Sequence, residues 1–399
     1  MSGCIAVINA GSSSVKFALF DASSIAASLF HGQIEGIGTA PRLTVRDAAN
    51  QTVTEREWGA AGFDHDVATR EILSTTRSLI SGTSVVGIGH RVVHGGMKYD
   101  SPVRLTSEML AELTQLVPLA PLHQPHNLAP IRTILDAAPQ IPQVACFDTA
   151  FHRSQPSLAQ SFAIPRKFTE LGVRRYGFHG LSYEYLVSRL AELAPDIASR
   201  RIIIAHLGNG ASLCAVNEGR SVASTMGFTA VDGLMMGTRS GAIDPGFILY
   251  LLQEHRMDAA AIEDLIYRKS GLLGVSGISS DMRALRGSSE SNAREAIALF
   301  VYRIVREIGS LVAALGGVDA FVFSGGIGAN DAATRSEVIA ACAWTGAALD
   351  PGRNAAGGNL ISAGSSRVPV WVIPTDEERM IAQHTQRLLK TMQAPRVSA

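Results

Sequence analysis

Two distant segments of the chain share one plan, in which a short glycine-containing turn joins two apolar, strand-like runs. The first segment, Ile5 to Asp21, reads IAVINAGSSSVKFALFD, and the second begins at Ile202 and reads IIIAHLGNGASLCAVNEG. Glycine adopts positive φ without a Cβ clash, and successive backbone N–H groups form a concavity that binds anions. One such hairpin is usually only a turn between strands. Two copies indicate a duplicated domain that grips a phosphate from both sides.

The composition describes a well-buried globular protein. At 399 residues the chain exceeds one ordinary core, so two domains are expected. Hydrophobic residues make up 46% and charged residues 18%, and Lys+Arg and Asp+Glu both total 35. Because the net charge is zero, no overall field draws the protein to nucleic acid or to an anionic membrane. We therefore expect small molecules or further copies of the chain as partners.

The cysteines and the N-terminal residues indicate the cellular compartment in which we expect the protein. Cys4, Cys146, Cys214 and Cys342 lie in or beside apolar stretches without CxxC or Cys/His clustering, which argues against zinc and against a disulfide framework. The N-terminus has no basic n-region or apolar h-region, and no apolar run reaches the length of a membrane span. We expect an unexported, soluble protein of the reducing cytoplasm.

Strand-like runs alternate with helical patterns, which indicates an α/β protein. The clearest helix prediction covers residues 292–315, where apolar residues recur at spacings of three and four before Gly316-Gly317. The strand after it leads into SGGIGAN, residues 324–330, which we expect to be a ligand-facing loop. We expect irregular structure over 118–142 and a loose tail over 392–399. The strand-like runs are 5–8, 15–20, 85–88, 144–147, 202–205, 212–216, 320–323 and 368–373.

No Walker A motif and no Rossmann fingerprint is present, but nine blocks spread in order along the chain together resemble the acetate kinase family. The blocks are NAGSSSVK (9–16), HRVVHGG (90–96), PLAPLHQPHN (118–127), FDTAFH (147–152), RYGFHG (175–180), HLGNGAS (206–212), MMGTRSGAIDP (235–245), SSDMR (279–283) and PTDEERMI (374–381). Each block alone is weak, and the ordered set is highly specific.

The resemblance implies a duplicated two-domain, actin-like α/β fold, as in the acetate and sugar kinase, Hsp70 and actin superfamily, with an interdomain nucleotide cleft. We expect one domain over 1–150, joined by the C-terminal segment 385–399, and a nucleotide-binding and dimerisation domain over 151–384. The implied reaction is a reversible, direct phosphoryl transfer between ATP and acetate that gives acetyl phosphate and ADP. Magnesium, or manganese in its place, is the implied metal, and a homodimer the implied assembly.

Four residues match the catalytic positions of the family. Arg91 and Arg239 match arginines at acetate and at the phosphoryl group, anions that a fork of N–H donors suits. His179 matches a histidine that donates to the phosphoryl group. Asp148 matches a catalytic carboxylate, but acetate has already lost its proton near neutral pH. We therefore expect Asp148 to position Arg91 or the magnesium shell, with a capping role in the turn after its strand as the alternative.

The resemblance also implies the metal and nucleotide positions. Asn9 and Glu377 match the metal site, and we expect Glu378 to be the solvated neighbour. Asp281 and Arg283 match residues that hold the nucleoside, and His123 is a phosphate neighbour or a structural histidine. The other implied nucleotide-binding residues are Ser12, Ser14, Lys16, His206, Leu207, Gly208, Asn209, Gly210, Met282, Gly326, Ile327, Gly328, Ala329 and Asn330.

The substrate pocket and its surroundings depart from the family in places. Val93, Leu122 and Phe178 match the apolar pocket, whereas Ala230 stands where proline is common, which leaves room for the extra methylene of propionate. One methylene is worth only about 1–3 kcal/mol of discrimination, so partial promiscuity is expected. The other departures are Leu181 and Tyr183, in place of threonine and histidine, Ala242 in place of aspartate, and Ala329 in place of glutamate.

Three other functions remain open at this point. A propionate or butyrate kinase would share the mechanism, and relative kcat/KM values would separate it from an acetate kinase. An Hsp70-like, nucleotide-gated binding module would hydrolyse ATP without an acid acceptor. A sugar kinase shares the fold but has no use for Arg91 beside an apolar pocket. If the chain is an acetate kinase, we expect its two domains to close and exclude water.

Overall fold

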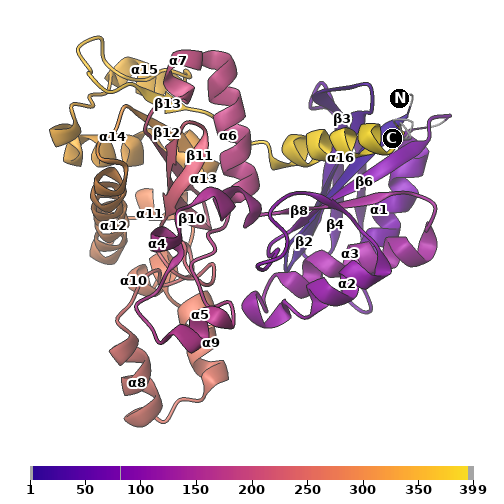
Figure 1. The fold of residues 1–399 in the computed structure, drawn as a ribbon, viewed down its shortest axis with the longest axis horizontal. Coiled ribbons are helices and arrows are strands. Elements are labelled where there is room, and N and C mark those ends of the chain that lie inside the picture. Colours follow the sequence, from indigo (N-terminus) through magenta and orange to yellow (C-terminus); the bar gives the residue numbers. More distant parts are fainter. Residues whose placement is uncertain (1–2, 81, 394–399) are drawn as a thin grey trace. The chain divides into compact units, whose positions relative to one another are not determined.

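The computed structural model describes residues 3–80 and 82–393. The chain divides into two compact units, of which one comprises Met1–Phe151 with Asp376–Ala399 and the other comprises His152–Thr375. Figure 1 shows that each unit carries its own β-sheet with helices packed around it.

The sheet of the first unit has the strand order β5-β4-β3-β2-β1-β6-β8-β7. β1 is antiparallel to β2 and parallel to β6, and β6 is parallel to β8. The strands are β1 (Cys4–Ala10), β2 (Ser14–Asp21), β3 (Ser24–Glu35), β4 (Arg42–Asp47), β5 (Thr52–Glu57), β6 (Val85–Val92), β7 (Val103–Arg104) and β8 (Gln143–Phe147).

Helices cover both faces of this sheet. Alternate residues of β1, such as Ala6 and Ile8, pack in one core with Ile72 of α1 and Ile134 of α3. On the other face, a Cβ at Gly89 of β6 would overlap side chains of α16, so glycine permits this close approach. The helices are α1 (His65–Leu79), α2 (Ser107–Thr114), the 3₁₀ turn η1 (Val117–Leu119), α3 (Gln124–Ala137) and α16 (Glu377–Gln393), and η2 (Ala150–Ser154) spans the unit boundary.

The sheet of the second unit has the strand order β11-β10-β9-β12-β13. Its strands are β9 (Ile202–Leu207), β10 (Ala211–Asn217), β11 (Arg220–Ser224), β12 (Ala320–Ser324) and β13 (Val370–Val372). Its helices are α4 (Ser157–Gln160), α5 (Arg166–Glu170), α6 (Gly180–Leu193), α7 (Pro195–Ala198), α8 (Pro245–Gln253), α9 (Ala259–Arg268), α10 (Gly271–Ser276), α11 (Met282–Arg286), α12 (Ser291–Leu315), α13 (Gly325–Asn330), α14 (Ala332–Ala341), η3 (Ala343–Thr345) and α15 (Pro351–Ala356).

The two sheets repeat one topology. In each, an antiparallel hairpin, β1-β2 or β9-β10, is followed by a further antiparallel strand, β3 or β11, on its outer side. On the inner side, two parallel strands follow, β6 and β8 in the first unit and β12 and β13 in the second. The duplication expected from the paired glycine turns is therefore present in the strand order itself.

The long helix prediction is confirmed, since α12 covers Ser291–Leu315 and ends at Gly316, which adopts the left-handed conformation at φ 68°. Each of the strand-like runs overlaps a strand, with the last one shortened to Val370–Val372. The outer strands β3, β4 and β5 were not among those runs, because β5 and much of β3 are exposed and polar.

Three local predictions are wrong. SGGIGAN forms the short helix α13 rather than a loop, and the guanidinium of Arg335 binds the carbonyl oxygens of Gly328 and Ala329 within it. Much of the stretch 118–142 is the helix α3, which tolerates Pro130 in its interior because its apolar face is buried. The predicted tail begins too early, since α16 continues to Gln393, and residues 394–399 lie outside the described part of the chain.

Over residues 3–80 and 82–393, none of the helices combines the length and the apolar character that crossing a membrane requires.

Candidate active site

The first unit presents its glycine turn at the end of the β1-β2 hairpin. The register pairs Asn9 with Lys16, and the Gly11 N–H donates to the Ser14 carbonyl at 2.7 Å. Ser12 and Lys16 are exposed. Nε2 of His65 lies 2.7 Å from the carbonyl oxygen of Gly11 and anchors the turn from α1. The tip therefore offers hydroxyls, N–H groups and a nearby cation to an anion.

Arg91 and Asp148 form a two-point ion pair in the first unit. Nε of Arg91 donates to Oδ1 at 3.0 Å, and Nη2 donates to Oδ2 at 2.5 Å. Asp148 follows β8 and Arg91 lies near the end of β6, and these two strands are neighbours. Although burial lowers the pKa of Arg91, the carboxylates of Asp148 and Glu377 raise it above its ordinary value. Arg91 is thus a permanent cation, held in one orientation.

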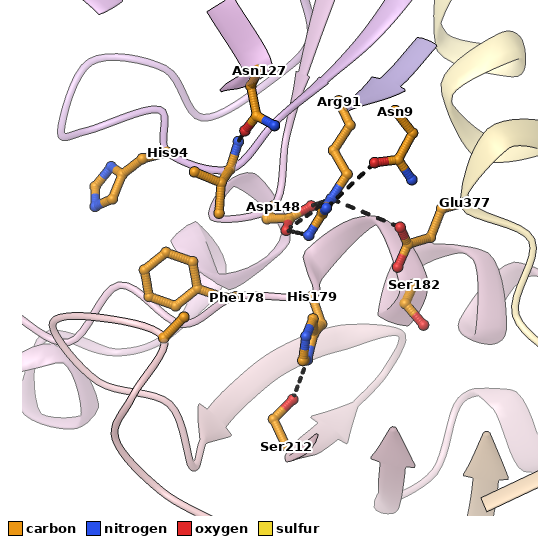
Figure 2. Close-up of polar contacts among 12 residues, drawn as sticks. Asn9, Arg91, His94, Asn127, Asp148, Phe178, His179, Ser182, Ser212 and Glu377 are labelled. Atoms are coloured by element: carbon orange, nitrogen blue, oxygen red, sulfur yellow. Dashed lines mark hydrogen bonds and ion pairs between the residues drawn. The ribbon is translucent and has the colours of Figure 1, made fainter. Parts of the chain in front are cut away.

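Asn9 and two glutamates complete this cluster, and Figure 2 shows Arg91 with Asn9, Asp148 and Glu377 around it. Nη1 of Arg91 donates to Oδ1 of Asn9 at 3.4 Å, and Oε2 of Glu377 lies 3.8 Å from Nε of Arg91. Nδ2 of Asn9 donates to Oε1 of Glu378 at 3.2 Å. Glu378, which we expected to be the solvated neighbour, is half-buried and is bonded to Asn9.

The chemistry of this cluster fits a magnesium ion. Burial raises the pKa of Glu377, Arg91 opposes the rise, and Asp148 and Glu378 add to it, so that the pKa lies at about 7. A cation would relieve this crowding of carboxylates, and magnesium takes oxygen ligands while it keeps several waters. No group of three or more His, Cys, Asp or Glu in the described residues forms a ready-made metal cage, and magnesium does not need one.

A buried amide that sequence reasoning missed braces this region. Oδ1 of Asn127 accepts from the Val93 N–H at 2.8 Å, and Nδ2 donates to the Ala10 carbonyl at 2.5 Å. Asn127 therefore joins the end of β6 to the end of β1. The only sequence signal for this role was its place in the PLAPLHQPHN block. Val93 itself is buried, while Leu122 and His123 are half-buried just before α3.

In the second unit, His179 is held at the N-terminus of α6. Its backbone is left-handed at φ 58°, which is uncommon for a residue other than glycine. Nδ1 lies 2.9 Å from Oγ of Ser212, and the ring stacks on His206 with a centroid separation of 4.4 Å. Nδ1 of His206 in turn lies 2.8 Å from Oγ of Ser182. Both imidazoles are therefore oriented by serine hydroxyls.

Arg239 and His179 approach the same glycine. A Cβ added at Gly210 would lie 2.8 Å from Nη2 of Arg239 and 3.2 Å from Nε2 of His179. Nη1 of Arg239 donates to the carbonyl oxygen of Ala230 at 2.6 Å. The second glycine turn therefore lies beside a guanidinium and an imidazole, both of which bind phosphate oxygens.

A pocket of about 810 Å³ opens in the second unit near these groups. Asp281 and Arg283 face it but form an ion pair of 2.6 Å with each other. Ser280, Arg286 and Asp331 also line it and were not predicted. Leu207 and Gly328, also predicted for the nucleotide, are buried and are not among the lining residues. The predicted residues that line the pocket are Gly208, Asn209, Asp281, Met282, Arg283, Gly326, Ile327 and Asn330.

Comparisons with known proteins agree with the motifs and the geometry. A family model described as the acetokinase family matches residues 4–383. The chain belongs to this family. An acetate kinase of Methylocella silvestris is 52% identical to it over 404 residues, which cover 99% of this chain and 100% of that relative.

Two solved structures show the same fold. The crystal structure of Porphyromonas gingivalis acetate kinase matches with a TM-score of 0.86 and 38% identity, over 97% of this chain and 100% of that one. A propionate kinase from Francisella tularensis matches with a TM-score of 0.90 and 36% identity, over the same shares of 97% and 100%. The family resemblance and the duplicated actin-like α/β fold are confirmed.

Proposed function

We propose that this enzyme transfers the γ-phosphoryl group of ATP directly and reversibly to acetate and gives acetyl phosphate and ADP. The observation that carries the proposal is the ion pair in which Asp148 holds the partly buried guanidinium of Arg91 in one orientation. Such a group suits a small carboxylate substrate. The 52% identity to an acetate kinase over the full length supports the same substrate.

Asp148 acts in this proposal as a positioning residue and not as a base. Acetate is ionised near neutral pH, so the nucleophilic oxygen carries no proton to remove. Both oxygens of Asp148 accept hydrogen bonds from Arg91. Asp148 therefore orients the guanidinium that binds the substrate carboxylate.

The second unit supplies the groups for the migrating phosphoryl group. Phosphoryl transfer needs in-line positioning and donors around the equatorial oxygens. Nη2 of Arg239 and Nε2 of His179 both approach Gly210, and we assign them this task. Asn9 and Glu377 would hold magnesium, which when bound neutralises charge on the β- and γ-phosphates.

ATP would occupy the pocket near α11 and α13. Its volume of about 810 Å³ falls in the range of ligand pockets. We assign Asp281 to the ribose hydroxyls and Arg283 to the adenine face. Because these two side chains form an ion pair here, nucleotide binding would exchange that pair for contacts with the nucleoside. Ser12, Ser14 and Lys16 in the first hairpin are assigned to the phosphates.

A homodimer in the cytoplasm is part of the same proposal. α8 exposes several large apolar side chains, and an exposed apolar face on a helix marks an interaction surface. These side chains are Phe247, Leu249, Tyr250 and Leu252. Light scattering of wild type and Leu249→Asp tests the assembly, and a monomeric wild type would contradict it. The four cysteines are buried and form no disulfide, which suits a reducing compartment.

The identity of the phosphoryl acceptor can be tested by trapping the acetyl phosphate that forms. Incubation with ATP, magnesium and acetate, followed by hydroxylamine, should yield acetohydroxamate, and Arg239→Ala should lose nearly all of it. Arg91→Ala should mainly raise KM for acetate. ADP release that does not depend on an acid would contradict the proposal and favour an Hsp70-like module.

Small-angle scattering with and without ATP and acetate tests the expected closure of the domains.

Propionate is the second candidate acceptor, because Ala230 replaces the common proline and one similar structure is a propionate kinase. Ala230→Pro should raise the ratio of kcat/KM for acetate to that for propionate by about 10-fold. A wild-type preference for propionate would overturn the choice of acetate and leave the mechanism unchanged.

A further inference from the structure

A buried row of hydrogen bonds connects Tyr183 with His179. The hydroxyl oxygen of Tyr183 lies 2.5 Å from Oγ of Ser212, and the same Oγ lies 2.9 Å from Nδ1 of His179. Tyr183 and Ser212 are both 0% exposed. Tyr183 stands one helical turn after His179, and its N–H donates to the His179 carbonyl at 3.0 Å. The backbone of α6 therefore sets the spacing of the row.

The protons along this row are limited in number. The Tyr183 phenol is neutral, because burial raises its pKa well above the ordinary value, so it carries one proton. Ser212 has a single hydroxyl proton and two lone pairs. When Tyr183 donates to Ser212, the Ser212 proton turns to Nδ1 of His179. Nδ1 then accepts, and the proton of the neutral imidazole resides on Nε2.

We propose that Tyr183, acting through Ser212, holds His179 in the tautomer that carries its proton on Nε2. This atom faces the place where a phosphoryl oxygen would bind, since a Cβ on Gly210 would lie 3.2 Å from it and 2.8 Å from Nη2 of Arg239. A donor is useful at Nε2, whereas a lone pair there would repel an anion. Tyr183 is a positioning residue, and it replaces the histidine that is usual in the family.

The proposal rests on the proposed function only for its effect on turnover, because the tautomer itself is observable without substrate. Around the His179 ring, Ser212 lies at Nδ1, His206 stacks on one face, and Arg239 approaches the same glycine as Nε2. Tyr183 is the member of the row that can be changed without removing a contact atom of His179.

The first experiment is NMR spectroscopy of the full chain labelled with ¹⁵N-histidine. Long-range ¹H–¹⁵N correlations at pH 9, above the ordinary imidazole pKa of about 6.5, identify the tautomer of each ring, and His179→Asn assigns the signal. We expect Nε2–H in wild type and a mixture of tautomers in Tyr183→Phe. An Nδ1–H ring or an imidazolium in wild type, or an unchanged Nε2–H ring in Tyr183→Phe, would overturn the proposal.

Tyr176→Phe is the matched control, because Tyr176 is also buried and its hydroxyl donates to the Gly172 carbonyl at 2.7 Å. This variant should leave the His179 signal unchanged. A shifted His179 signal in Tyr176→Phe would show that the loss of any buried phenol hydroxyl perturbs the ring. That result would also contradict a specific role for the row of hydrogen bonds from Tyr183. Thermal unfolding of both variants tests that they remain folded.

The second experiment measures turnover. Tyr183→Phe should lower kcat about 10-fold, the effect of one hydrogen bond on the barrier, with KM for ATP and acetate nearly unchanged. Ser212→Ala and the double variant of Tyr183→Phe with Ser212→Ala should lower kcat by the same factor, because each breaks the same row of hydrogen bonds. Additive losses would contradict the coupling. If wild type failed to phosphorylate acetate, the proposed function would fail while the NMR result would still decide the tautomer.

Discussion

The carboxylate of Asp148 meets the guanidinium of Arg91 side by side, with Nη2 and Oδ2 2.5 Å apart. The Asp148 side chain is 1% exposed and that of Arg91 is 17% exposed, so this charge pair is shielded from screening by water. Removing one partner of a buried pair leaves the other without compensation. The pair should therefore affect both stability and substrate binding.

We expect Asp148→Asn to raise KM for acetate and to lower kcat/KM about 100-fold, because a guanidinium that turned toward Glu377 would be misplaced for the substrate. Asp148→Ala should also lower the free energy of unfolding by roughly 3 kcal/mol. Steady-state kinetics and urea denaturation measure the two effects. Asp264→Asn is the control, because its ion pair with Lys269 is largely exposed and should hardly matter. An unchanged KM for acetate in Asp148→Ala would contradict the positioning role.

The titration of Glu377 should make stability depend on pH. Its folded pKa of about 7 lies above the unfolded value near 4.5, so the folded state binds a proton that the unfolded state releases between these values. The stabilisation is complete below about pH 4.5 and is lost as the pH rises through 7. Urea denaturation of the metal-free protein at pH 5 and pH 8 should show a loss on the order of 2 kcal/mol. Glu377→Gln should remove this loss, and an identical pH dependence in both proteins would contradict the assignment.

Magnesium should couple to the same proton, because a metal ligand must be deprotonated. We expect the binding of magnesium with ADP at pH 6.5 to release a proton from wild type and to release less from Glu377→Gln. Calorimetry in two buffers of different ionisation enthalpy measures the number of protons released. Equal release by both proteins would show that Glu377 does not hold the metal.

Gly210→Ala should lower kcat, because the added methyl group would crowd two neighbouring side chains. The new methyl group would press on Nη2 of Arg239 at 2.8 Å and on Nε2 of His179 at 3.2 Å, and misplaced catalytic groups cost about 100-fold. Gly309→Ala in α12 is the control, because its Cβ would meet nothing within 4 Å and alanine favours a helix. The kcat of the two variants is the comparison, and equal values would contradict the crowding at Gly210.

Arg335 should hold α13 in place for the nucleotide. Arg335 is 2% exposed, and its guanidinium binds Oδ1 of Asn354 at 2.7 Å and the carbonyls of Gly328 and Ala329 at 3.0 and 2.9 Å. Arg335→Met leaves these buried acceptors unpaired, at about 1–3 kcal/mol each. We expect a lower melting temperature and a higher KM for ATP. Arg353→Met, on the exposed side of α15, should change neither, and a wild-type KM in Arg335→Met would exclude the role.

Local patterns sufficed for the elements whose signals are local. The apolar runs predicted β1, β2, β6, β8, β9, β10, β12 and β13, and the three-and-four spacing with Gly316 predicted α12 and its end. β5 was missed because it is polar and exposed and pairs only with β4, and β4 was missed because only Leu43 and Val45 in it are apolar and buried. Pro130 and SGGIGAN misled because burial of α3 and the Arg335 contacts outweigh local propensity.

By itself, the sequence determined the family, the duplicated plan and the residue types of the site, because glycine turns and motif spacing are written along the chain. Which groups bind each other was decided by tertiary structure. Arg91 reaches Asp148 across 57 positions, and Asn9 reaches Glu378 across 369. Ser212 comes between His179 and Tyr183 because β10 packs beside α6. Hydrogen bonds require approach within about 3 Å, and only the packing of distant elements provides it.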